Sequence, residues 1–153
     1  MKKSTKILLG SAFGAAAAAY GACTLIDNLL LNRHMVPSPE FSAKVTGCDL
    51  SDREEEHNKH KLWLENYGYE KYYMLSDRGE QLTAYLVKPE KESNVYAFCA
   101  HGYRSDAKGE FCQIVQYYME KGINVFMPDH VASGESEGTY CTFGYYEEPD
   151  CLK

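Results

Sequence analysis

The segment that most constrains the fold of this chain spans residues 94–127, where two apolar runs flank an amphipathic helical pattern. The runs NVYAFCA at residues 94–100 and INVFM at 123–127 contain few polar side chains, as is typical of strands buried on both faces of a sheet. Between them, apolar residues recur with helical spacing over residues 111–118. A strand–helix–strand unit of this length forms a right-handed crossover between parallel strands. The segment therefore predicts an α/β fold with a partly parallel sheet.

A β-hairpin is predicted ahead of this unit. Residues 69–76 (YEKYYMLS) and 81–88 (QLTAYLVK) are rich in residues that favour strands, and Pro89 ends the second run. The sequence Asp-Arg-Gly-Glu between the two runs is typical of a turn. We therefore expect residues 67–153 to form one globular α/β part that begins with this hairpin.

A linker and one amphipathic helix are predicted over residues 37–66. Two prolines near residue 38 interrupt regular structure, as expected of a linker. Ser51 and Glu54 match a capping box, which predicts a helix over about residues 52–66. His57 and His60 lie three residues apart on that helix, but no third metal ligand accompanies them, so we interpret them as two exposed histidines.

The first 36 residues resemble a membrane-targeting segment. Lys2, Lys3 and Lys6 precede an uncharged stretch over residues 7–26, which is closed by Asp27. Twenty helical residues just cross a hydrocarbon core of about 30 Å. A retained signal anchor is favoured over a cleaved signal peptide, because Tyr20 and further apolar residues follow Ala19, after which a signal peptide would be cleaved. The lysines place the amino terminus in the cytoplasm and the globular part outside.

Three other interpretations of this segment stay open. Ala17 and Ala19 could mark the cleavage site of a signal peptide, which would release a secreted domain. Cys23 could carry a lipid, although Tyr20 stands where such signals hold an aliphatic residue. The apolar helix could also pack on the globular part.

Charge and cysteine spacing exclude several classes of function. Residues 37–153 hold 12 basic and 21 acidic residues, so this part lacks the basic surface that binding to nucleic acid requires. Six cysteines occur without any Cys-x-x-Cys pair, which gives no indication of a zinc site. We expect no metal, no cofactor and no nucleic-acid partner.

Three segments of the chain resemble the amino-terminal part of the α/β-hydrolases, in their serine aminopeptidase-like and lipase-like branch. They are NVYAFCAHGYRSDA at residues 94–107, YYMEKGINVFMPD at 117–129 and SGESEGTYCTFG at 133–144. The resemblance covers roughly residues 67–151. It implies a partial α/β-hydrolase fold with three αβα layers, built from the hairpin and the crossover unit. Members of this branch cleave ester or amide bonds, and bacteria often anchor them by an N-terminal helix.

The resemblance also implies roles for particular residues. Gly102 would turn the backbone sharply after a strand, so that the amide of Tyr103 could donate to an oxyanion. His101 is interpreted as a structural histidine, because the catalytic histidine of this family comes last in the chain. Asp129, Gly134, Ser136 and Gly138 would belong to a structural loop. Val131, Ala132 and Ser133 depart from the family pattern, which holds arginine, glycine and histidine at these positions.

The run Gly-Glu-Ser-Glu-Gly at residues 134–138 matches the G-x-S-x-G pattern of a nucleophile elbow. Such an elbow needs a strand that runs straight into the turn and a helix that leaves it. The predicted strand ends at Met127, and no helix is predicted directly after Gly138, so we do not interpret Ser136 as the nucleophile.

We therefore expect the catalytic triad to lie downstream of residue 153, and the chain alone to be inactive on esters and peptides. A hydrolase completed by a further C-terminal part would act on a small ester or peptide. The alternative is a non-catalytic, membrane-anchored hydrolase remnant or binding module.

Overall fold

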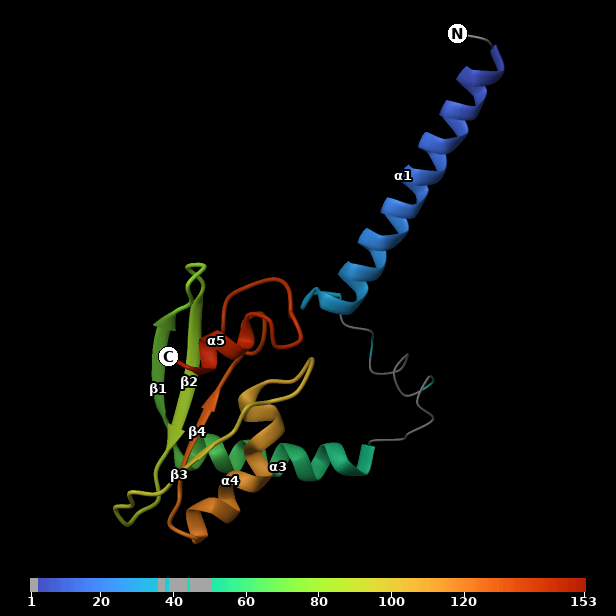
Figure 1. The fold of residues 1–153 in the computed structure, drawn as a ribbon. Helices are drawn as coiled ribbons and strands as arrows, with labels where there is room; N and C mark the ends of the chain where they lie inside the picture. The colour runs from blue at the N-terminus through green and yellow to red at the C-terminus, as the bar shows by residue number, and fades with distance from the viewer. Residues whose placement is uncertain (1–2, 36–37, 39–43, 45–50) are drawn as a thin grey trace.

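The computed structural model describes residues 3–35, 38, 44 and 51–153 (Figure 1). The helices and strands are, in chain order, α1 (Lys3–Leu31), α3 (Ser51–Tyr67), β1 (Glu70–Leu75), β2 (Gln81–Val87), β3 (Tyr96–Phe98), α4 (Ala107–Glu120), β4 (Asn124–Pro128) and α5 (Glu147–Cys151). The predicted helix over 52–66 is confirmed as α3 to within one residue at each end, and the helical pattern over residues 111–118 lies within α4. Gly122 follows α4 with φ +68°, as expected of a residue that ends a helix.

The four strands form one mixed sheet in the order β1-β2-β4-β3. β1 and β2 pair antiparallel across the predicted turn, so the hairpin is confirmed. β3 and β4 pair parallel, with Ala97 opposite Val125, and α4 connects them. The predicted crossover is therefore also confirmed. β2 joins the hairpin to the crossover unit by antiparallel pairing with β4.

Two helices cover one face of this sheet and build the core. Alternate residues of β2 and β4 point to this face, and α3 and α4 pack against it (Figure 1). The core side chains are Leu64, Tyr85, Val87, Ala107, Cys112, Val115, Val125 and Met127. Because the two helices also contact each other, the sheet and both helices share one apolar core.

The opposite face of the sheet carries the short helix α5. A cavity of about 250 Å³ lies there, between Leu82, Ala84 and Phe126 of the sheet and Asp150 and Cys151 of α5. α5 is thus the start of a third layer, and the predicted αβα arrangement is confirmed.

The strand predicted over residues 94–100 is shorter and more exposed than expected. β3 contains only Tyr96–Phe98, and the side chains of Tyr96 and Phe98 are 62% and 53% exposed. Within the described residues, β3 is an edge strand, and its two rings point to the face that carries the short helix α5. The prediction that this run is buried on both faces is therefore wrong.

Helix α1 extends away from the globular part (Figure 1). Its segment Phe13–Leu31 is long and apolar enough to cross a membrane, and none of it is buried against the rest of the chain. A signal sequence near the amino terminus would have the same properties, so both interpretations stand. The alternative in which this helix packs along the globular part is wrong for the described span Phe13–Leu31, because only the last turn of that span contacts the domain.

Candidate functional site

His101 and His130 meet at the carboxyl ends of the parallel strands β3 and β4. His101 is buried, and its Nε2 accepts a hydrogen bond of 3.0 Å from the backbone amide of His130. Its Nδ1 lies 2.9 Å from the carbonyl oxygen of Gly102, which fits a proton on Nδ1. Burial and the nearby His101 lower the pKa of His130. His101 therefore joins the two loops that leave these strands.

The loop after His101 presents a free backbone amide at Tyr103. The Gly102 amide donates to Glu110 Oε2 at 2.8 Å, and the Gly102 carbonyl accepts from the Ser105 amide at 3.3 Å. Among the described residues, the amide of Tyr103 has no hydrogen-bond acceptor. A cavity of about 290 Å³ lies beside it, lined by His101, Gly102, Tyr103, Arg104, His130, Ser133, Cys141, Phe143, Gly144 and Glu147. This unbonded amide thus belongs to a residue that lines the cavity.

Asp129 connects the sheet, helix α4 and the loop that follows β4. Its Oδ1 accepts from the Ala107 amide at 2.8 Å, at the start of α4. Its Oδ2 accepts from the Tyr85 hydroxyl at 3.0 Å and from the Glu135 amide at 2.8 Å. The Asp129 side chain is only 2% exposed, so this carboxylate organises the base of the loop from inside the protein.

Ser136 lies inside the protein rather than in the cavity. Its hydroxyl donates to the Asp129 carbonyl at 2.6 Å and accepts from the Thr83 amide at 2.9 Å. The residue is 2% exposed, and no histidine of the described chain contacts the hydroxyl. A nucleophile needs a neighbouring base and access to substrate. This geometry supports a structural role for Ser136.

Three loop residues adopt the left-handed backbone conformation. Gly134 has φ +49°, and a Cβ atom added to it would lie 2.1 Å from Asp129 Oδ2. Gly138 has φ +109°, and its added Cβ would lie 2.7 Å from Val131 Cγ2. Ala132, at the position where the family pattern holds glycine, has φ +60°. The loop therefore retains a glycine-like conformation even where the glycine is replaced.

Arg33 holds this loop from the outside, a contact that the sequence analysis missed. Its Nη1 donates to the Ser136 carbonyl at 2.6 Å, and its Nη2 donates to the Gly134 carbonyl at 2.9 Å. The resemblance leads one to expect an arginine at position 131, where this chain holds valine. Arg33 thus supplies a guanidinium to the loop from directly after α1.

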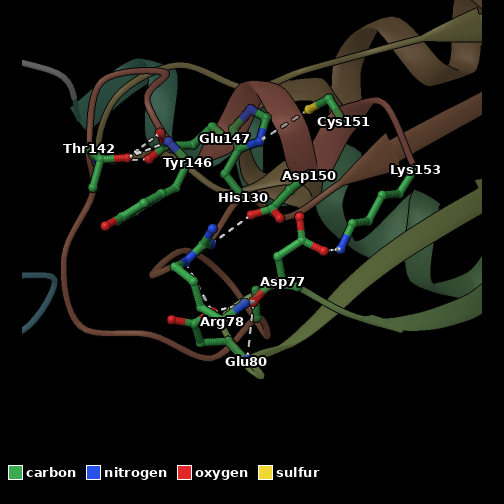
Figure 2. A network of polar contacts seen from close by, with 12 residues as sticks. Asp77, Arg78, Glu80, His130, Thr142, Tyr146, Glu147, Asp150, Cys151 and Lys153 are labelled. Atoms are coloured by element: carbon green, nitrogen blue, oxygen red, sulfur yellow. Dashed lines mark hydrogen bonds and ion pairs between the residues drawn. The ribbon is translucent and has the colours of Figure 1, made fainter.

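Glu147 holds residues 142–144, at the end of the loop that follows β4, by hydrogen bonds (Figure 2). Its carboxylate accepts from the Thr142 amide at 2.8 Å, from the Thr142 hydroxyl at 2.6 Å and from the Gly144 amide at 2.8 Å. Burial raises the pKa of Glu147, but these hydrogen bonds outweigh it and lower the pKa to about 2. Nearby, Arg78 pairs with Asp150 at 2.8 Å and lies over the ring of Tyr146.

We expect Glu147→Gln to destabilise the protein at neutral pH and to have a much smaller effect in acid. The folded pKa of Glu147 lies below the ordinary glutamate value of 4.5, so the carboxylate stabilises the fold above about pH 4.5. This stabilisation is lost as the pH falls from 4.5 towards 2. The measurement is urea unfolding of wild-type protein and variant across this range. A difference between them that stays constant with pH would contradict the prediction.

Two cysteine–histidine pairs lie among the residues that the structure describes, and neither has an activated thiol. Cys151 Sγ lies 3.8 Å from His130 Nδ1, and Cys112 Sγ lies 3.6 Å from His57 Nδ1. Burial raises the pKa of both thiols, which keeps them protonated and poorly nucleophilic. His57 and His60 are half-buried rather than exposed, which corrects the sequence interpretation. In the described part of the chain, no three His, Cys, Asp or Glu residues cluster as metal ligands would.

Comparisons with solved structures identify the fold. The esterase Pf2001 of Pyrococcus furiosus is 24% identical, with a TM-score of 0.50 over 57% of this chain and 34% of that protein. An α/β-hydrolase of Vibrio vulnificus is 24% identical, with a TM-score of 0.43 over 56% of this chain and 29% of that one. The Francisella virulence factor BioJ is 18% identical, with a TM-score of 0.34 over 64% and 34% of the two chains.

This chain thus spans about a third of the length of these structures. No family model matches the sequence, and no curated protein is significantly similar to it. The likeness to the esterase agrees with the mixed sheet, the crossover through α4 and the short third layer. The described part of the chain therefore has a partial α/β-hydrolase fold.

Proposed function

We propose that residues 67–153 are the amino-terminal part of a serine-hydrolase-like domain that cleaves ester or amide bonds. The observation that carries this proposal is the free amide of Tyr103, which borders a cavity at the carboxyl edge of the sheet. In acyl transfer, a fixed N–H donor stabilises the negative charge that develops on the carbonyl oxygen. One such donor typically contributes about 3 kcal/mol to the lowering of the barrier.

The contacts of the loop support this role for Tyr103. The Gly102 amide is bonded to Glu110 and His101 is bonded to the His130 amide, so the backbone on both sides of the loop is held. A donor that is fixed in advance requires little reorganisation when charge develops. Under this proposal, Tyr103 acts through its backbone, and His101 and Gly102 position it.

The proposal assigns the nucleophile, the base and the orienting acid to residues beyond position 153. Ser136 is buried and bonded to the backbone, and the thiols of Cys112 and Cys151 have raised pKa values. These same observations favour the second candidate function, a membrane-anchored module without catalysis.

We also propose that α1 anchors the chain in a membrane with the globular part outside the cytoplasm. The apolar span Phe13–Leu31 supports a crossing, and Lys2, Lys3 and Lys6 support a cytoplasmic amino terminus. A signal peptide cleaved after Ala19 is the alternative. Cleavage there would leave the last turn of α1 and Arg33 attached to the domain.

We expect residues 1–153, purified in detergent, neither to hydrolyse p-nitrophenyl acetate nor to react with a fluorophosphonate probe. The reason is that acyl transfer needs an accessible nucleophile within hydrogen-bond reach of a base. Wild-type protein and Ser136→Ala should give the same background in both assays. Labelling of wild-type protein that disappears in Ser136→Ala would show that Ser136 is a nucleophile after all.

The role of Tyr103 is tested in a chain extended by the neighbouring in-frame coding sequence. If that sequence encodes a strand, a G-x-S-x-G turn and a helix, Tyr103→Pro should lower kcat by about 10²–10³-fold, because proline has no N–H. Tyr103→Phe keeps the amide and should retain activity. Equal activity of the two variants would refute the oxyanion role. Absence of such a downstream pattern would favour the module without catalysis.

A further inference from the structure

The globular part binds the carboxyl end of α1. The last carbonyls of a helix have no partner within the helix. Here the Leu31 carbonyl accepts from the Cys141 amide at 2.9 Å, the Leu30 carbonyl accepts from the Tyr103 hydroxyl, and the Leu29 carbonyl accepts from the Arg104 guanidinium. A cation at this end also complements the helix dipole. The last turn of α1 is therefore attached to the loops around the candidate site.

Three aromatic side chains surround this attachment, and we call them the aromatic rim: Tyr103, Tyr140 and Phe143. Tyr103 and Phe143 stack with their ring centroids 4.7 Å apart, and the Tyr140 hydroxyl donates to Asn28 Oδ1 at 3.3 Å. All three remain exposed, by 44%, 46% and 65% in that order. Figure 1 shows the loop that carries Tyr140 and Phe143, in red, beside the base of α1.

Phe143 is held outward at a cost in backbone energy. Its φ is +53°, a conformation that is rare for a bulky side chain. Such strain persists where the surrounding structure enforces it, and it concentrates at functional positions. The bonds of Glu147 to Thr142 and Gly144, on either side of Phe143, enforce it here. The fold thus keeps this ring at the surface instead of burying it.

The length of α1 sets the level of the rim relative to a membrane. If residues 7–26 fill the hydrocarbon core, Asn28 and Leu30 lie two and four residues beyond it, or about 3 and 6 Å along the helix axis. The headgroup region on each side is about 5–8 Å thick. If Phe13–Leu31 fills the core instead, the rim contacts the helix at the core's outer boundary. Both registers place the rim at the membrane interface.

We propose that the aromatic rim docks into the phospholipid headgroup layer of the membrane that α1 crosses. Tyrosine and other aromatic rings with one apolar and one polar side favour this layer. Arg104, beside the rim, adds a positive charge near the phosphates. The cavity next to Tyr103 then opens close to the membrane surface. This inference rests on the proposed anchoring by α1.

The test places a tryptophan on the rim and another away from it. Phe143→Trp is compared with Tyr96→Trp, which lies on the exposed edge strand β3. Each substitution is made in the full chain in two versions, one that retains Trp63 and one that carries Trp63→Phe. If the loss of Trp63 prevents folding, the version that retains Trp63 still gives the result. The chains are reconstituted into phosphatidylcholine vesicles with or without bromine on the upper part of the acyl chains. We expect several-fold stronger quenching by brominated lipid for Phe143→Trp than for Tyr96→Trp.

Flotation of the vesicles after alkaline extraction separates the two proposals. Chains that do not float with the lipid would refute the anchoring itself. Floating chains with equally weak quenching at both positions would overturn the rim proposal while the anchoring stands. Equally strong quenching at both positions would also overturn it, because the domain would then lie on the lipid without a specific surface.

Discussion

Replacement of Asp129 by alanine is expected to lower the free energy of unfolding by about 3–5 kcal/mol. The change removes the acceptor of two backbone amides, at Ala107 and Glu135, and of the Tyr85 hydroxyl. All three bonds end on a carboxylate that is 2% exposed, so water does not readily replace it. Each buried donor left without a partner costs about 1–3 kcal/mol. The measurement is urea unfolding of the full chain in detergent, followed by the fluorescence of Trp63.

Two further variants control this experiment. Asp129→Asn keeps one carbonyl acceptor and should lose less stability than Asp129→Ala. Asp77→Ala removes an exposed carboxylate that pairs with Lys153, and it should destabilise the protein far less than Asp129→Ala. A loss in Asp129→Ala no larger than in Asp77→Ala would mean that the buried network does not hold the loop.

The parts of the fold that depend on local patterns could be predicted from the sequence. The strand-favouring residues and turn of the hairpin and the helical spacing in α4 each reflect contacts between residues close in the chain. The exposure of β3 could not be predicted, because the apolar run at residues 94–100 does not tell which strands lie beside it. Helix α5 is short and contains Pro149, and its sequence carries no helical periodicity to indicate it.

The part of the candidate site that is formed by a single sequence motif could be predicted. The His-Gly-Tyr turn follows directly from the strand before it, so its position could be inferred. Arg33 could not be found in this way, since its partners Gly134 and Ser136 lie about 100 residues away. The guanidinium of Arg33 binds backbone carbonyl oxygens. Every residue has such a carbonyl, so the sequence does not indicate which ones accept the bond. Glu147 was missed for the same reason, because two of its three donors are backbone amides.

Gly134→Ala is expected to be the most damaging of the small substitutions in this loop, with a loss of about 3–5 kcal/mol. The left-handed φ of +49° already disfavours alanine, and the new Cβ would lie 2.1 Å from Asp129 Oδ2 and 2.2 Å from its Cγ. The carboxylate would have to move, and its bonds to Ala107, Glu135 and Tyr85 would weaken. Gly68→Ala is the matched control, because Gly68 has φ +92° and no atom within 4 Å of the added Cβ. It should lose only about 1–2 kcal/mol from backbone strain.

A double variant separates the collision from the backbone strain. Once Asp129 is alanine, the carboxylate atoms that the Gly134 Cβ would meet are gone. Gly134→Ala should then cost no more than Gly68→Ala, and the two loop substitutions should fall well short of additivity. Unfolding is measured for the wild-type protein, the two single variants and the double variant. All samples contain the same concentration of a stabilising osmolyte, so that the least stable variant keeps a folded baseline. Additive losses would show that Gly134 is required for its backbone conformation alone and not for the close approach of Asp129.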